Sequence, residues 1–195
     1  MTADAPAGRR ERKKAATRQA IADAALELFL ARGFDRVSIR DVAEAADVAT
    51  TTVFKHFASK EALVFDRDNA VEAELTAAVR GRPAGQDVLE ALRLHALSSW
   101  VPVTADPGLA ELATLVEQTP ALQEHVQHMW ARHAEALAVL LAQELGREAS
   151  DPACSALARF VLQVPTLIGS AAEPRAAADA AFDLLTQGWR AHTDR

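Results

Sequence analysis

Residues 38–60 read SIRDVAEAADVATTTVFKHFASK, and this stretch decides the fold of the first part of the chain. Ser38 is a residue type that begins helices, because its hydroxyl accepts a hydrogen bond from an amide of the first turn. Asp47 then interrupts the helical period and tolerates the left-handed backbone of a tight turn. Between them, one apolar stripe at helical spacing indicates a short helix; it contains Ile39, Val42, Ala43 and Ala46.

A second short helix is expected over residues 50–57. At about 100° per residue, Val53 and Phe57 point inward, whereas Thr51 and Lys55 lie at the centre of the opposite face. Threonine bonds base edges or touches a thymine methyl group, and lysine reaches a guanine edge or a phosphate. The two helices therefore predict a helix-turn-helix that binds duplex DNA through its major groove. The residues that flank this outward face are Thr50, which is also a candidate helix cap, Thr52 and Phe54.

The segment from Thr17 to Leu63, about a quarter of the chain, resembles the TetR family of bacterial one-component transcription regulators. Helical patterns and the absence of strand signals along the chain predict an all-α fold of about nine helices, and the resemblance agrees with a helix-turn-helix head and a larger helical body. The resemblance implies that His56 and Lys60 contact backbone phosphates. From its place on the first helix of the motif, Arg40 is expected to reach either the backbone or a base edge. The matching positions are Arg18, Ile21, Ala24, Ala25, Leu28, Phe29, Gly33, Phe34, Ser38, Ile39, Asp41, Val42, Ala43, Ala46, Val48, Thr52, Val53, His56, Phe57, Ser59, Lys60, Glu61 and Leu63.

Three positions depart from the family pattern. Asp47 stands where glycine is usual in the turn, and Ala49 stands where serine usually caps the second helix. Alanine has no side-chain acceptor, so this helix lacks its usual cap. Phe54 replaces a common tyrosine, which removes one hydroxyl from the DNA-facing side. For every cation of the motif, a solvated surface charge is the alternative interpretation.

Charge is distributed unevenly along the chain. Its net charge is −6, which by itself argues against a nucleic-acid partner. Residues 1–67 nevertheless hold 12 Lys or Arg and 10 Asp or Glu, a net charge of +2, whereas residues 68–195 hold 9 and 17, a net charge of −8. The run RRERKK at residues 9–14 predicts a flexible basic arm over residues 1–14 that follows the DNA backbone or enters a minor groove. A solubilising tail is the alternative.

Length and composition favour a DNA-binding domain over residues 15–63 and a ligand-binding and dimerisation domain over residues 64–195. A helix from about Ser59 to Arg80 is expected to link them, followed by helices near residues 86–101, 107–118, 120–145, 152–171 and 174–191. Prolines mark four of these starts: Pro107, Pro120, Pro152 and Pro174. The single cysteine excludes an intrachain disulfide, and the chain has neither an apolar signal core nor an 18-residue apolar run. We therefore expect a cytoplasmic protein without a membrane partner.

The last two predicted helices are apolar over much of their circumference, notably at residues 157–168. A helix on the surface of a monomer would carry a broad polar face. The resemblance implies that these two helices form the interface of a homodimer, whose two heads read the halves of a palindromic operator. A monomer with a well-buried core is the alternative.

The resemblance also implies a site for a small-molecule effector in the body. If this site exists, its walls are expected to be apolar, which favours a hydrophobic effector, with Arg93, Arg132 or Arg159 holding any acidic group. Ordinary core packing is the alternative for every candidate. The candidate lining residues are His95, Trp100, Leu115, Met129, Trp130, His133, Phe160 and Pro165.

Other chemistries find little support in the sequence. His125 and His128 are spaced for a shared metal but lack a further ligand nearby, and Cys154 has no adjacent cation to activate its thiol. We expect neither a metal nor another cofactor. The favoured function is a ligand-responsive DNA-binding regulator, most simply a repressor. A regulator controlled by a protein partner is the main alternative, and an all-α enzyme is a remote one.

Overall fold

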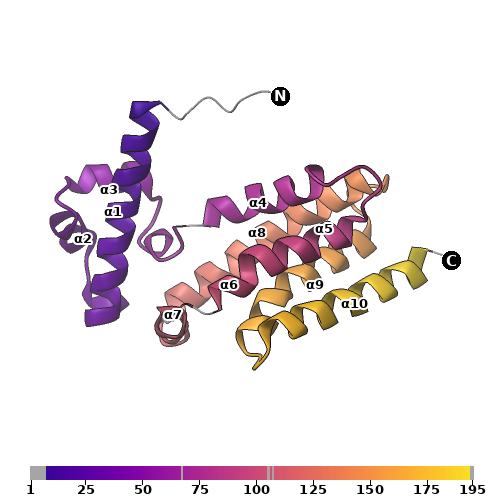
Figure 1. The fold of residues 1–195 in the computed structure, drawn as a ribbon. Coiled ribbons are helices and arrows are strands. Elements are labelled where there is room, and N and C mark those ends of the chain that lie inside the picture. Colours follow the sequence, from indigo (N-terminus) through magenta and orange to yellow (C-terminus); the bar gives the residue numbers. More distant parts are fainter. Residues whose placement is uncertain (1–7, 67, 105, 107, 194–195) are drawn as a thin grey trace. The chain divides into compact units, whose positions relative to one another are not determined.

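A computed structural model of the chain describes residues 8–66, 68–104, 106 and 108–193. These residues form helices and turns without a β-strand (Figure 1), so the all-α prediction is confirmed for the described chain. Contacts divide the chain into two compact units, which we call the head and the body. The head comprises Met1–Arg67 and Ala110–His125, and the body comprises Asp68–Leu109 and Val126–Arg195.

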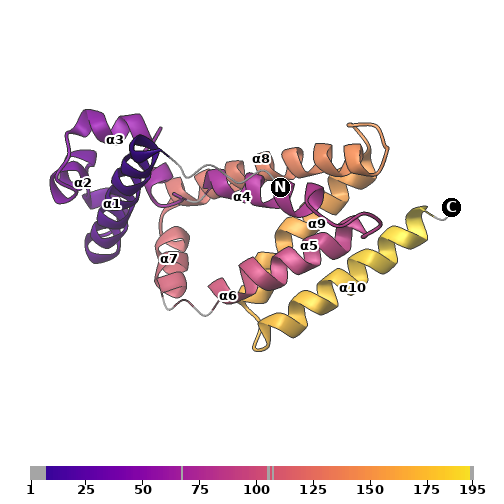
Figure 2. The same ribbon diagram turned by 45° about the horizontal axis from the view of Figure 1, so that its top comes forward.

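The head is built on α1 (Arg9–Arg32), which ends at Gly33 with a φ of 84°, a conformation that glycine adopts without strain. One face of α1 buries Ile21, Ala25 and Phe29, and Phe29 contacts the ring of Phe34 at 5.0 Å between centroids. Shorter elements follow α1 along the chain, and α2 and α3 lie beside it in Figure 2; they are η1 (Phe34–Arg36), α2 (Ile39–Ala45), α3 (Thr50–His56) and η2 (Glu61–Leu63).

The basic run at residues 9–14 is helical, so the prediction of a flexible arm over residues 1–14 is wrong for this part. Residues 9–14 form the first turns of α1, and the Arg12 amide donates to the Gly8 carbonyl at 3.1 Å. Arginine, lysine, glutamate and alanine are good helix formers, and Glu11 complements the dipole of the first turn. Residues 1–7 lie outside the described residues.

The head also takes in part of the second half of the chain, which differs from the predicted boundary. Leu115 of α7 (Gly108–Glu117) and Leu122 of α8 (Pro120–Glu144) are buried in the same apolar cluster as Phe29 and Leu63. His125 stacks on Phe65 at 5.4 Å between ring centroids. Apolar area of the head is therefore covered by residues distant in sequence, and helical periodicity alone gives no sign of this pairing.

The predicted continuous helix from Ser59 to Arg80 is wrong at its start. The chain forms the three-residue turn η2 and then a separate helix, α4 (Asp68–Arg80), whose end agrees with the prediction. Leu63 and Val64 are 1% and 8% exposed, which anchors the segment after η2 to the core of the head. Burial of these side chains competes with extension of the helix through this segment.

The body contains α4, α5 (Val88–His95), the π-helical turn η3 (Ala96–Trp100), α6 (Val101–Val103), most of α8, α9 (Pro152–Gly169) and α10 (Pro174–Thr193). Three predicted helix starts are confirmed, because α8, α9 and α10 each begin with the expected proline. Pro107 lies outside the described residues. The described chain has nine helices if α5, η3 and α6 count as one continuous helix.

The turn η3 lies within the single helix predicted over residues 86–101. There the Val101 amide donates to the Ala96 carbonyl, five residues earlier. The next residue is Pro102, which has no amide hydrogen and whose ring crowds the carbonyl four residues before it. A wider turn relieves this crowding, so the π-helical register has a local cause in the sequence.

In the described part of the chain, α9 alone is long and apolar enough to cross a membrane, with a mean hydropathy of 1.2 over 18 residues. Core helices share this property, and seven of its side chains are buried in the body; they are Cys154, Leu157, Ala158, Val161, Leu162, Val164 and Ile168. Packing therefore explains the apolar inner face of α9.

Candidate nucleic-acid interface

The first helix of the motif, α2, begins with the predicted cap. The Asp41 amide donates to Ser38 Oγ at 3.2 Å, and the Ser38 amide donates to Asp41 Oδ2 at 2.7 Å. Both members of this capping box therefore satisfy a backbone amide of the helix start. The hydrogen bonds from the Ser38 side chain and backbone also lower the pKa of Asp41, so the carboxylate that the box requires is stabilised.

The turn between the two helices contains a left-handed residue at the predicted position. Asp47 has a φ of 52°, and the following Val48 amide donates to the Ala43 carbonyl at 2.9 Å. In the described chain, Asp47 is the one non-glycine residue with positive φ. Such a conformation strains most side chains, and aspartate is among the few that tolerate it. The turn therefore keeps its geometry without the glycine of the family pattern.

The second helix, α3, starts without a side-chain cap. Ala49 occupies the cap position and Thr50 is the first helical residue, so the prediction that Thr50 acts as a cap is wrong. The first turn is closed instead by backbone bonds, with the Thr52 amide donating to the Ala49 carbonyl at 2.8 Å. An uncapped start leaves other amides of this turn to water.

The two faces of α3 are those expected from the sequence. Val53 and Phe57, at its end, are 1% and 2% exposed and pack into the core of the head. Outside this core lie the side chains proposed to meet DNA. Thr50, Thr51, Phe54 and Lys55 are exposed, as is Arg40 on α2, whereas Thr52 and His56 are half-buried.

Phe54 is the unusual member of this face, because its large apolar side chain is 58% exposed. It is placed where the family pattern has tyrosine, so an apolar edge replaces a hydroxyl on the outer side of α3.

The position of Lys60 differs from the one that the resemblance implies. Its ammonium donates to the Phe34 carbonyl at 2.6 Å and lies 4.1 Å from the centre of the Phe34 ring. Ser59 does accept a bond from the Ala62 amide, at 3.3 Å, but it caps the short turn η2 and not a long helix. In this arrangement Lys60 holds the head together, and a phosphate contact requires its ammonium to turn outward.

Arg18 of α1 is the main residue whose role sequence reasoning missed. Its guanidinium donates to the carbonyl of His56, the last residue of α3, and lies 4.2 Å from the centre of the Phe57 ring. It also pairs with the Asp66 carboxylate at 2.6 Å and donates to the Asp66 carbonyl at 3.3 Å. The signal in the sequence was a cation in line with the apolar stripe of α1, at helical spacing from Ile21 and Ala25.

His56 is placed at the end of α3, but as a neutral side chain. Partial burial lowers its pKa, and the charges of Arg18 and Lys14 lower it further. Because the usual histidine pKa is about 6.5, the imidazole is uncharged at neutral pH. It therefore offers a phosphate one N–H donor and not a full positive charge.

The eight candidate pocket residues do not line one cavity. Leu115 belongs to the core of the head, Phe160 is 60% exposed on α9, and Met129 is buried. Two ring pairs form within single helices of the body, at 5.4 and 5.8 Å between centroids; they are His95 with Trp100 and Trp130 with His133. Pro165 is half-buried within a continuous α9.

Two hollows along α4 and α8 share lining residues, and we call them together the α4–α8 groove. Their volumes are about 490 and 610 Å³. Ala73, Ala77, Val139 and Leu140 provide apolar lining. Polar side chains are more numerous than the sequence predicted; they are Glu72, Thr76, Arg80, Arg132, His133, Glu135 and Gln143. Arg93, a predicted anchor, instead pairs with Asp183 and donates to the Asp179 carbonyl of α10.

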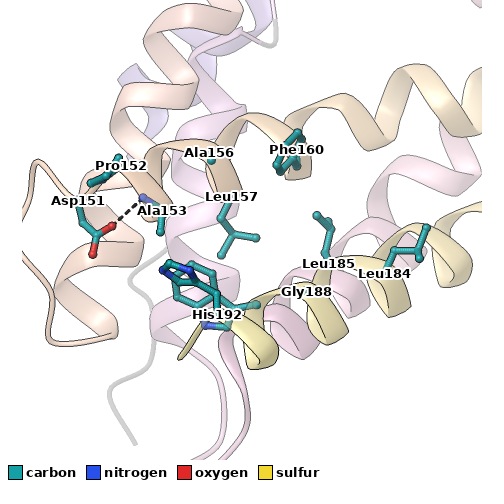
Figure 3. Close-up of a pocket in the computed structure, with 11 residues that line it drawn as sticks. Asp151, Pro152, Ala153, Ala156, Leu157, Phe160, Leu184, Leu185, Gly188 and His192 are labelled. Atoms are coloured by element: carbon teal, nitrogen blue, oxygen red, sulfur yellow. Dashed lines mark hydrogen bonds between the residues drawn. The ribbon is translucent and has the colours of Figure 1, made fainter. Parts of the chain in front are cut away.

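The outer faces of α9 and α10 carry exposed apolar side chains. Phe160, Leu167 and Leu184 are 60%, 48% and 72% exposed. A hollow of about 590 Å³ lies between the first half of α9 and the second half of α10 (Figure 3), and a second of about 680 Å³ continues along the same helices. An apolar surface of this extent is typical of a protein interface.

Together, the capped α2, the left-handed turn and the exposed face of α3 define a helix-turn-helix protein. The chain matches the family model "Bacterial regulatory proteins, tetR family" over residues 21–66. It is 30% identical over 141 residues to the mycofactocin biosynthesis transcriptional regulator MftR of Mycobacterium tuberculosis, a match that covers 72% of this chain and 71% of MftR. The chain belongs to the TetR family and is a transcriptional regulator.

A second relative matches over a shorter stretch of the chain. The HTH-type transcriptional regulator TcmR of Streptomyces glaucescens is 41% identical over 85 residues, which covers 44% of this chain and 38% of TcmR. The match therefore spans well under half of that relative. A match of this length does not carry the specificity of TcmR over to this chain.

Solved structures share the fold over most of the chain. NalD of Pseudomonas aeruginosa, the secondary repressor of the MexAB-OprM multidrug efflux pump, has a TM-score of 0.59 at 24% identity, covering 90% of this chain and 97% of NalD. The SmeT–triclosan complex has a TM-score of 0.59 at 22% identity, covering 89% of this chain and 91% of SmeT. At these identities the likeness establishes the fold alone.

Restoring the missing cap should stabilise the head. In Ala49→Ser, the new hydroxyl accepts a bond from a first-turn amide of α3, and the free energy of unfolding should rise by roughly 1 kcal/mol. Urea denaturation followed by circular dichroism measures this change. Ala58→Ser adds the same hydroxyl outside a helix start and should shift stability by less than about 0.5 kcal/mol. Equal effects of the two substitutions would contradict the capping argument.

Proposed function

We propose that this regulator is a homodimeric repressor that binds a palindromic operator and releases it when a hydrophobic small molecule binds the body. The observation that carries the DNA-binding part is the outer face of α3. On a helix whose other apolar side chain, Val53, is buried, Thr51 and Lys55 are exposed beside the 58% exposed Phe54. Packing of the head does not explain why threonine, lysine and a large apolar side chain are exposed together on one face of α3. Contact of this face with the major groove of DNA explains it.

Each proposed DNA contact follows from the position of its side chain. Thr50, Thr51, Thr52 and Lys55 are proposed to meet base edges, with Phe54 beside them at the groove wall. Arg40, His56 and Lys60 are proposed to meet backbone phosphates, His56 as a neutral donor and Lys60 after its ammonium leaves the Phe34 carbonyl. Backbone contacts set the register of the head, and the base contacts select the sequence.

Removal of the central side chains of α3 should weaken specific binding. We expect Thr51→Ala/Lys55→Ala to weaken binding to the DNA flanking its own gene about tenfold or more, because each base contact contributes roughly 1–3 kcal/mol. The measurement is a titration with excess random DNA as competitor. Arg175→Ala removes one charge from α10 and should leave affinity unchanged. An equal loss of affinity in both variants would indicate that binding depends on overall charge and not on the face of α3. If wild type shows no specific binding to this DNA, the operator does not flank the gene.

The dimer proposal rests on the apolar outer faces of α9 and α10. The hollow in Figure 3 is lined by Leu157 and Phe160 from α9 and by Leu184 and Leu185 from α10. Exposing such side chains to water costs about 25 cal/mol per Å² of apolar area, which association with a second copy would recover. Two heads joined in this way double the number of bases that are read.

A charge on this face should separate the two subunits. Wild type should have twice the 20.9 kDa mass of one chain in light scattering at micromolar concentration. We expect Leu184→Glu to give a folded monomer, because the buried carboxylate would lack a partner. Leu94→Glu places the same charge on an exposed leucine of α5 and should remain dimeric. A monomeric wild type would refute this proposal.

The effector proposal rests on the α4–α8 groove and on the neighbours in structure. SmeT binds triclosan, a small hydrophobic molecule. In this chain the groove combines apolar side chains, such as Val139 and Leu140, with the guanidinium groups of Arg80 and Arg132. A hydrophobic effector with an acidic group fits this mixture better than a purely apolar one. Such a ligand lowers DNA affinity only if it binds the released state more tightly.

Filling the groove should block the effector. Probes are triclosan and stearoyl-CoA, the latter bound by the structurally similar FadR of Bacillus subtilis, and at least one should raise the melting temperature of wild type and weaken operator binding. Ala73→Leu projects a larger side chain from the groove lining, and the shift should shrink. The control is Ala176→Leu, which makes the same substitution at an exposed position of α10 outside the groove. Its shift in melting temperature should equal that of wild type. If no hydrophobic compound shifts the melting temperature, control by a protein partner becomes the better proposal.

The cytoplasmic location expected from the sequence fits a regulator that acts on chromosomal DNA, and we retain it as part of the proposal. The remote alternative of an all-α enzyme gains nothing from the family match, because members of this family are transcriptional regulators.

A further inference from the structure

The first turns of α1 extend past the packed part of the head and carry a dense cluster of cations. Buried residues of α1 begin at Ile21, whereas residues 8–16 are all exposed. Five of the six residues from Arg9 to Lys14 are basic, and Glu11 is the exception. A helix that is polar all round gains little from packing, and cations crowded on it repel one another. An anion bound nearby relieves this repulsion.

The direction of this cluster is set by Arg18. Its guanidinium is held against the His56 carbonyl and the Phe57 ring, so this face of α1 meets the end of α3. Residues four apart lie on the same face of a helix, one turn after another. Lys14 therefore continues the face of Arg18 by one turn, and Arg10 continues it by a second turn.

Lys13 differs from Lys14 only in direction. Both are exposed lysines of the same helix, but their side chains leave the axis about 100° apart. Measured from Arg18, Lys14 is displaced by about 40° and Lys13 by about 140°, so Lys13 points away from α3. The electrostatic influence of Lys14 on His56 agrees with this placement, and Lys13 exerts none that is resolved.

We propose that Arg10 and Lys14 bind a backbone phosphate of duplex DNA beside the bases read by α3. This inference rests on the proposed DNA-binding function and adds a preformed contact outside the helix-turn-helix. Lys14 presents an exposed point charge whose field reaches the half-buried His56. Arg10, one turn further out, offers a planar donor group to the same or the next phosphate. Because the segment is already helical, binding does not require a disordered arm to fold.

A competing role for Lys14 is stabilisation of α3. A cation near the last turn of a helix interacts favourably with its dipole, and this effect needs no DNA. The two roles differ in their response to salt. A phosphate contact releases counterions, so the logarithm of the binding constant falls with the logarithm of salt concentration by about 0.9 per contact. Stabilisation of α3 alone changes the melting temperature and leaves this slope unaltered.

The test compares Lys14→Ala with Lys13→Ala in the full-length protein, using an operator selected from random duplexes by wild type. We expect Lys14→Ala to weaken binding about three- to tenfold and to reduce the salt slope by about 0.9 per subunit, or about 1.8 for the dimer. Lys13→Ala removes an equal charge and should change the slope by much less. Arg10→Ala/Lys14→Ala should reduce the slope further. Melting curves of all variants should match that of wild type, since these side chains are exposed.

Three results would overturn the proposal. If Lys13→Ala and Lys14→Ala reduce the salt slope equally, the reduction comes from the total positive charge of this part of α1 and not from a contact made by Lys14. An unchanged slope in both variants would exclude a phosphate contact, and a lower melting temperature of Lys14→Ala with an unchanged slope would assign Lys14 to α3. If wild type selects no operator, the proposed DNA-binding function itself fails, and this outcome is seen before any variant is compared.

Discussion

One guanidinium fixes the end of the helix on which the proposed DNA recognition depends. Arg18 holds the last carbonyl of α3, lies over the Phe57 ring and pairs with Asp66. A seven-residue helix is too short to be stable alone, so its position must come from tertiary contacts. At its start, α3 has only backbone bonds around Ala49 and the left-handed Asp47. The helix is therefore held firmly at its end and weakly at its beginning.

The same contact ties α3 to the segment that leaves the head. Asp66 pairs with Arg18 through its carboxylate and accepts a hydrogen bond from it through its carbonyl, and α4 begins two residues later. A displacement of this segment that breaks the ion pair removes one restraint on the guanidinium that bonds the carbonyl of His56. This chain of contacts is contiguous and charged, so it offers a physical route by which the segment before α4 alters the orientation of α3. Lys60, bound to the Phe34 carbonyl, holds the intervening loop in a similar way.

The sequence predicted the elements well because their signals are local. Ser38, the prolines at the starts of α8, α9 and α10, and the inward Val53 and Phe57 are each set by neighbours within a few residues. The failures concern contacts between distant residues. Lys60 bonds a carbonyl 26 residues away, and Leu115 and Leu122 enter the core of the head from beyond residue 100. Periodicity predicts which face of a helix is buried, but it does not predict which other helix covers that face. For this reason the eight candidate pocket residues lie in several separate places in the structure. Their roles and those of the DNA-facing residues remain proposals.

The uneven distribution of charge along the chain affects how the protein binds DNA. With a net charge of −6, the whole chain has no long-range attraction to DNA, which weakens binding to random sequence. At physiological salt, charges beyond about 8 Å are largely screened, so the −8 of residues 68–195 matters little at a contact. Cations that touch phosphates then contribute almost all of the electrostatic attraction. For this reason, the direction in which Lys14 and Lys55 point matters more for DNA binding than the total charge of the chain.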